Sequence, residues 1–172
     1  RGTAHHFGLT DVDVQLGTLS KALGSVGGYV AGRKELIEYL INYSRSFIFS
    51  TALSPADIGA ALEALRIVQD EPAVVDTLRD NTMYMTHKLQ AMGIDCDDET
   101  PIFPIVVGEN DRALTLAREL EERGIIITAI RPPTVPVGES RLRMTVTAAH
   151  SKEQLDYVAQ TLHELLVDMN IH

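Results

Sequence analysis

Apolar and polar side chains alternate over residues 12–17, a pattern that predicts a half-buried strand. A short apolar run between glycines predicts a second strand over residues 28–32, and the run FIFST predicts a third over residues 47–51. Between the second and third strands, apolar residues recur at helical spacing over residues 33–45. We therefore expect the first part of the chain to mix short strands with helices.

Two long helices are predicted to follow. Ser54 offers a capping hydroxyl and Pro55 a first-turn proline, so a helix should begin there and run to about Asp70. Pro72 starts the next helix, and Gly93 should close it in the left-handed conformation. The residues that we expect the first helix to bury are Ile58, Ala61, Leu62, Leu65 and Val68. The apolar series of the second is Val75, Leu78, Thr82, Met85, Leu89 and Met92.

The rest of the chain alternates strands and helices. The expected order is strand 102–107, helix 111–123, strand 125–130, turn 131–140, strand 142–147 and helix 152–169. Ser151 and Gln154 have the spacing of a capping box for the last helix. The fold class is thus α/β, and we expect residues 71–172 to form a small α+β domain with a three-stranded sheet, separate from residues 1–70.

Composition excludes several classes of protein. The net charge of −9 argues against nucleic acid or an anionic membrane as a partner, and no run reaches the roughly 18 apolar residues that span a bilayer. The single cysteine, Cys96, excludes an internal disulfide, and its acidic neighbours should raise the pKa of its thiol. We expect no metal at the adjacent His5 and His6, a structural hydrogen bond at His150, and a cytoplasmic location.

One lysine lies in a setting unlike the others. Three of the four lysines fall on predicted helices, whereas Lys21 lies in the loop GTLSKALGSVGG, residues 17–28. Thr18 and Ser20 supply hydroxyls there, and the glycines let backbone amides approach an anion closely. An amine beside such donors suits pyridoxal phosphate, which needs an imine and a phosphate site together. Loop chemistry alone leaves open a glycine-rich loop without catalytic function.

Longer stretches carry a family resemblance. The segment VDVQLGTLSKALGSVGGYVAG resembles the cofactor-lysine segment of the α-oxoamine synthases, which belong to the fold-type I pyridoxal phosphate enzymes. The segment AIRPPTVPVGESRLRMTVTAAHS is similar to the members that join L-alanine to a pimeloyl thioester in biotin synthesis. RGTAHHFGL and RSFIFSTALSP also fit, so the resemblance covers the whole chain. It implies that residues 1–70 are the end of the large cofactor-binding domain and residues 71–172 the small C-terminal domain.

The resemblance assigns roles residue by residue. Lys21 would bind pyridoxal 5'-phosphate and act as the base at the substrate α-carbon, and Thr18 would hydrogen-bond the phosphate. Ser50 and Thr51 would reach the phosphate of a neighbouring subunit, which implies a homodimer. The implied substrates are L-alanine and pimeloyl-CoA or a pimeloyl-carrier protein.

A second group of candidates surrounds the proline-rich turn. The resemblance implies that Thr134 contacts substrate and that Arg143 pairs with the amino-acid carboxylate. Arg141 and Arg143 flank one residue of a predicted strand and so should share a face, which could bind an anion or form surface ion pairs. Arg131, before two prolines, is a further substrate-contact candidate.

The resemblance also implies residues that these 172 do not supply. Family members have an aspartate at the pyridine nitrogen and a ring-stacking histidine, both upstream of the lysine segment. We therefore expect this chain to be part of a longer protein, with weak cofactor binding and no turnover of its own. The alternatives are an enzyme joining glycine to acetyl-CoA, or a non-catalytic C-terminal fragment.

Overall fold

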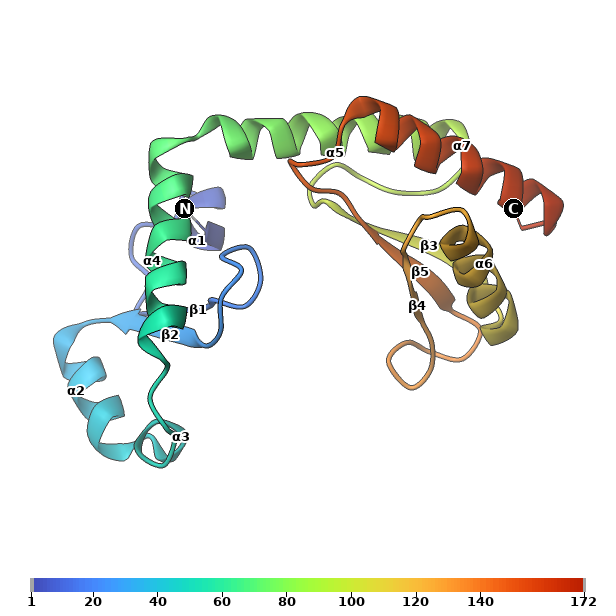
Figure 1. Ribbon diagram of the computed structural model, residues 1–172. Coiled ribbons are helices and arrows are strands. Elements are labelled where there is room, and N and C mark those ends of the chain that lie inside the picture. The colour runs from blue at the N-terminus through green and yellow to red at the C-terminus, as the bar shows by residue number, and fades with distance from the viewer. Residues whose placement is uncertain (1, 172) are drawn as a thin grey trace. The chain divides into compact units, whose positions relative to one another are not determined.

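The computed structural model describes residues 2–171, which separate into two compact units, residues 2–71 and 72–171. Unit 1 contains an antiparallel hairpin and four helices, drawn in blue to green in Figure 1. Its elements are α1 (Gly2–His6), β1 (Val14–Thr18), β2 (Gly28–Gly32), α2 (Lys34–Tyr43), α3 (Arg45–Ile48) and α4 (Pro55–Asp70).

The predicted third strand of this unit is wrong. Residues 45–48 form the short helix α3 instead, and residues 51–54 are irregular. The amides of Phe47 and Ile48 donate to the carbonyl of Ser44, and the amide of Phe49 donates to that of Arg45. These local bonds satisfy the backbone, so the aromatic run needs no partner strand.

Burial in unit 1 also differs from the sequence prediction. Of the α4 residues expected to be buried only Ala61 is, while Ile58, Leu62 and Leu65 are exposed. The strand at β1 is present, but its apolar side chains are not covered, and Leu16 is 79% exposed. The residues of β2 are all exposed as well.

Unit 2 forms a closed α+β layer. Its elements are α5 (Ala73–Ala91), β3 (Ile102–Gly108), α6 (Asn110–Glu122), β4 (Thr128–Ile130), β5 (Ser140–Thr145) and α7 (Lys152–Asp168). The sheet is antiparallel in the order β3-β5-β4, as the three-stranded prediction required, although β4 is shorter than expected. Side chains alternate along β3 and β5 between a buried and an open face.

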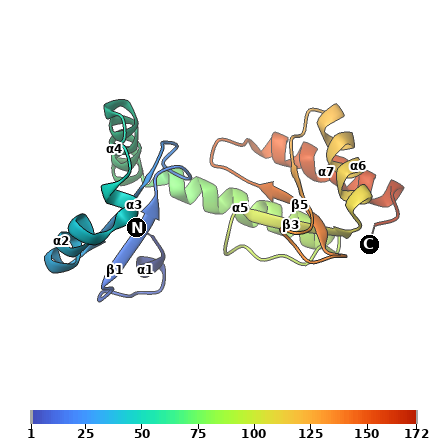
Figure 2. The ribbon, with the colours of Figure 1, turned by 90° about the horizontal axis from the view of Figure 1, so that it is seen from below.

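The buried face of the sheet packs against all three helices of unit 2 (Figure 2). Phe103, Leu142 and Met144 from the strands meet Leu89 of α5 and Leu162 of α7 in one apolar cluster. Because the helices occupy this face, the opposite face, which carries the arginines of β5, is left open.

Helix ends agree with the caps expected from the sequence. The Ser54 hydroxyl accepts from the amide of Asp57, and Ser151 with Gln154 forms the reciprocal capping box of α7. Gly93 ends α5 with a φ of +83°. No helix within residues 2–171 is long and apolar enough to cross a membrane.

Candidate functional site

Lys21 lies in the loop that joins β1 to β2. The hairpin ends at the pair Thr18 and Gly28, and the loop is closed by a bond from the Leu19 amide to the Gly27 carbonyl at 2.9 Å. The Lys21 side chain is exposed, and none of the ion pairs found among residues 2–171 involves it. The loop therefore presents an exposed side-chain nitrogen without an ion-pair partner.

Two hydroxyls lie next to this lysine in the sequence. The Oγ atoms of Thr18 and Ser20 are 2.8 Å apart, and Thr18 Oγ1 also accepts the Ser20 amide at 3.2 Å. The Thr18 hydroxyl is within 3.2 Å of the Gly27 carbonyl, to which it can donate. Both residues are exposed, so their hydroxyls can donate hydrogen bonds to an anion.

The loop glycines are explained by backbone packing as well as by the predicted approach of backbone amides to an anion. A Cβ on Gly28 would lie 2.9 Å from the Gly17 carbonyl oxygen, and one on Gly27 would lie 2.7 Å from Leu53 Cδ1. Gly27 also has a φ of +100°, which disfavours any other residue. These contacts explain Gly27 and Gly28 without a ligand.

A hollow of about 590 Å³ lies between the hairpin and α2. Thr18 lines it, together with apolar residues of β1, β2 and α2, but Lys21, Ser50 and Thr51 do not. Ser50 and Thr51 follow α3 and are exposed, and the Ser50 hydroxyl donates to the Ser46 carbonyl. Ser50 would have to release this bond in order to donate to a phosphate.

The open face of the unit 2 sheet carries the second group of candidates. Thr134, Arg141 and Arg143 line one hollow of about 450 Å³, whose floor is apolar and includes Ile102 and Ile130. Arg143 pairs in register with Thr128 on one side and Pro104 on the other. The strand periodicity therefore brings both arginines to one face, as predicted.

The two arginines differ in their partners. Arg141 Nε donates to the Glu139 carbonyl at 2.9 Å, and its Nη2 donates to Glu139 Oε2 at 2.7 Å. None of the hydrogen bonds or ion pairs found within residues 2–171 involves the Arg143 side chain, which is exposed. Arg143 is thus the arginine of this face that is free to bind an anion.

Arg131 is exposed and does not line the hollow. It begins the turn in which the Thr134 amide donates to the Arg131 carbonyl at 3.0 Å, and the Pro132–Pro133 peptide bond of that turn is cis. The backbone of Arg131 therefore helps to place Thr134, whereas its side chain is not brought to the arginine pair.

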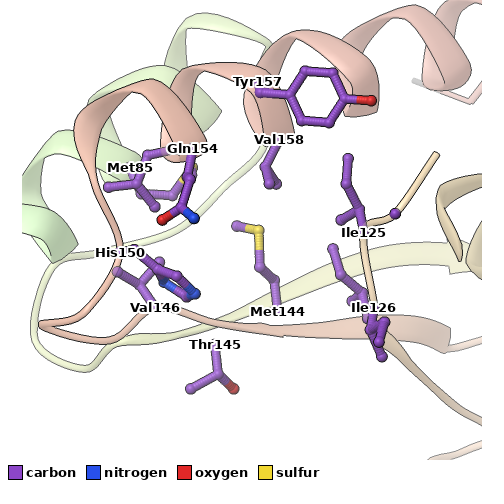
Figure 3. Close-up of a pocket in the computed structure, with 13 residues that line it drawn as sticks. Met85, Ile125, Ile126, Met144, Thr145, Val146, His150, Gln154, Tyr157 and Val158 are labelled. Atoms are coloured by element: carbon purple, nitrogen blue, oxygen red, sulfur yellow. The ribbon is translucent and has the colours of Figure 1, made fainter.

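A further hollow, of about 350 Å³, lies between α7, the end of β5 and the segment before β4 (Figure 3). His150 faces it, and its Nδ1 accepts the Thr147 amide at 3.2 Å, which agrees with the structural hydrogen bond expected there. The remaining side chains labelled around it are mostly apolar, among them Met144, Val146 and Val158 (Figure 3). None of the candidate site residues lines this hollow.

Other titratable groups serve structural contacts. Burial, and then the charges of Asp97 and Asp95, raise the pKa of the Cys96 thiol, so this cysteine is not an activated nucleophile. Asp156 of α7 accepts from Lys88 and from Tyr84 of α5, each at 2.6 Å. No group of three or more His, Cys, Asp or Glu within residues 2–171 is arranged to hold a metal ion.

Sequence reasoning did not find two of the residues that shape the arginine face. Glu139 pairs with Arg141, and buried Ser140 donates to Asn110 Oδ1 at 2.6 Å, which fixes the start of β5 to α6. A glutamate two residues before an arginine is a weak signal, because the pairing depends on the turn that precedes the strand.

The chain belongs to the family described as aminotransferase class I and II, whose profile matches residues 3–162. A curated relative, the 8-amino-7-oxononanoate synthase of Thermoanaerobacter pseudethanolicus, is 46% identical over 99% of this chain and 44% of its own length. The chain thus spans less than half the length of this relative.

Solved structures show the same fold. A structure of SPT with a PLP internal aldimine matches all of this chain and 44% of that one, with a TM-score of 0.93 at 24% identity. The 8-amino-7-oxononanoate synthase of Francisella tularensis matches 92% of this chain and 47% of that one, with a TM-score of 0.79 at 25% identity. The fold class is therefore that of the fold-type I enzymes, as the sequence resemblance implied.

Proposed function

We propose that this chain is part of a pyridoxal phosphate-dependent acyltransferase of biotin synthesis. The enzyme would condense L-alanine with a pimeloyl thioester, giving 8-amino-7-oxononanoate, CO₂ and a free thiol. The observation that carries the proposal is the exposed side-chain nitrogen of Lys21 in a hairpin loop that follows the paired hydroxyls of Thr18 and Ser20 in the sequence. The names of the relatives that are 42–48% identical support it.

The residues present fit the amine and phosphate ends of this cofactor. Lys21 would hold the cofactor through its side-chain nitrogen and, once released, move the proton at the substrate α-carbon. Thr18 would donate its hydroxyl hydrogen to the phosphate, since its present acceptor is a neutral carbonyl. When bound, the cofactor supplies an electron sink for the charge that develops at the α-carbon.

The sheet face of unit 2 would bind the amino acid. Arg143 would pair with the substrate carboxylate, because a guanidinium presents two parallel donors and this one has no competing partner. Thr134 lines the same hollow and would contact the substrate beside it. Arg131 stays a candidate for substrate contact through its side chain.

We further propose a homodimer in which Ser50 and Thr51 donate to the phosphate held by the neighbouring subunit. The Ser50 hydroxyl would exchange its bond to Ser46 for one to the phosphate, a stronger charge-assisted acceptor. In this arrangement residues 1–70 would belong to the large cofactor-binding domain and residues 71–172 to the small domain.

The test uses the longer protein that we propose, with product identified by mass spectrometry. L-alanine with pimeloyl-CoA should give 8-amino-7-oxononanoate, and Lys21→Ala should lower turnover at least about 1000-fold, since this amine would be the base. Lys34→Ala is the matched control, because Lys34 is exposed and pairs with Glu38, and it should leave turnover unchanged. Turnover of glycine with acetyl-CoA in preference to alanine would reject the substrate assignment and favour the alternative enzyme, which joins glycine to acetyl-CoA.

A further inference from the structure

We propose that Glu139 determines which carboxylates the arginine face accepts. By neutralising Arg141 it leaves Arg143 as the single unpaired cation, so the face selects ligands with one carboxylate. This inference deepens the proposed function by naming the substrate class of the same site, and it rests on that proposal for its biological meaning.

The geometry of the pair supports this role. Arg141 Nη2 lies 2.7 Å from Glu139 Oε2, and the Arg141 side chain is only 24% exposed, against 53% for Glu139. A second bond runs from Arg141 Nε to the main-chain oxygen of Glu139 at 2.9 Å. The guanidinium is therefore held in place by the backbone and neutralised by the carboxylate.

Neither of the strands next to β5 places a charged residue opposite Arg141. Its cross-strand neighbours are Val106 on β3 and Ile130 on β4, which are both apolar. Arg143 is flanked by Pro104 and Thr128, which are uncharged. Among the residues that contact or pair in register with the two arginines, Glu139 is thus the one that carries a negative charge.

The spacing of the arginines fits a dicarboxylate. Residues two apart on a strand lie about 6.6 Å apart and point to the same face. Without the Glu139 charge, Arg141 and Arg143 would offer two cations at a separation that the carboxylates of succinate can bridge. With the Glu139 charge in place, the second carboxylate of succinate would meet a neutral ion pair.

The experiment compares acetate and succinate binding by the ¹⁵N-labelled longer protein, followed by the Nε–H signal of Arg143 and the amide of Leu142. In the unsubstituted chain the two ligands should bind with dissociation constants within about twofold of each other. Glu139→Gln keeps the shape and the backbone bond but removes the charge, and should favour succinate about fivefold. Added salt should reduce that preference, because it screens the exposed charges.

Two further variants separate a charge effect from a structural one. Glu139→Asp retains the charge and should behave like the unsubstituted chain, and the double variant Glu139→Gln with Arg141→Gln should lose the succinate preference. An unchanged ratio in Glu139→Gln, or a preference that persists in the double variant, would overturn the inference. A face that responds to neither anion in any variant would overturn it too.

The titration is independent of the catalytic proposal, because it needs neither cofactor nor acyl thioester. Failure of Lys21 to support turnover would leave the succinate ratio unaffected. Failure of the ratio to change would leave the role of Lys21 intact.

Discussion

The two units differ in how far they bury their apolar side chains. All residues of the apolar core cluster lie in unit 2, where the sheet and three helices enclose them. Among the described residues of unit 1, Ala61 is the only buried apolar residue, while Leu16 and Phe49 are 79% and 77% exposed. The fold of unit 2 is therefore explained by its own packing, whereas unit 1 leaves most of its large apolar side chains exposed. The candidate lysine lies in unit 1, which is poorly packed, and the candidate arginines lie in unit 2, which is well packed.

The largest expected effect is on stability, and it contrasts two leucines of helices. Leu162→Ala in α7 removes a side chain with no exposed surface and should lower the free energy of unfolding of unit 2 by about 3 kcal/mol. Leu62→Ala in α4 removes one that is 53% exposed and should cost less than about 1 kcal/mol. Hydrogen exchange of amides in α7 and in α4 measures each unit separately. Equal losses would show that the units do not differ in packing.

A smaller effect is expected at the arginine face. In the longer protein, Arg143→Ala should raise the Michaelis constant for L-alanine about tenfold or more, because a charged pair with the carboxylate is lost. Arg131→Ala should change it less than about threefold, since the Arg131 side chain lies outside the hollow. Steady-state kinetics with both variants checks this. A larger effect at Arg131 than at Arg143 would place the carboxylate elsewhere.

The smallest effect concerns the pH dependence of the contact between α5 and α7. The hydrogen bond from Lys88, and then that from Tyr84, hold the pKa of Asp156 below its usual 3.8. The contact therefore stabilises unit 2 at pH values above about 4 and is lost as the pH falls through the lowered pKa. Asp156→Asn should therefore melt at a lower temperature than the unsubstituted chain at pH 7. In acid the two melting temperatures should converge.

Thermal unfolding at pH 7 and at pH 2 to 3 measures that change, with Tyr84→Phe as the control that keeps the Lys88 pair. A melting-temperature difference between Asp156→Asn and the unsubstituted chain that stays constant over this range would show that Asp156 does not act through its charge.

The parts of the fold that could be predicted are those coded by local chemistry. The caps at Ser54 and Ser151 and the strand at residues 28–32 follow from side-chain hydroxyls and short-range apolar patterns. The run at 47–51 misled because aromatic residues suit strands in general, whereas here the Ser44 carbonyl accepts the amides that start a helix. The predicted burial of the apolar residues of α4 is wrong, because a helical apolar stripe in the sequence does not show which element covers it.

The candidate site divides in the same way. The shared face of Arg141 and Arg143 follows from the two-residue period of a strand. The pairing of Arg141 with Glu139 depends on the turn before β5, and the bond from Ser50 to Ser46 depends on α3, which the sequence pattern did not predict. The roles of Lys21 and Thr18 stay predictions until tested.

The most direct test of the central claim is to add pyridoxal phosphate to the longer protein, reduce it with borohydride and map the labelled peptide by mass spectrometry. We predict a visible absorption band before reduction, and a label on Lys21 and not on Lys34. A label on another lysine, or an unchanged band in Lys21→Ala, would contradict the account.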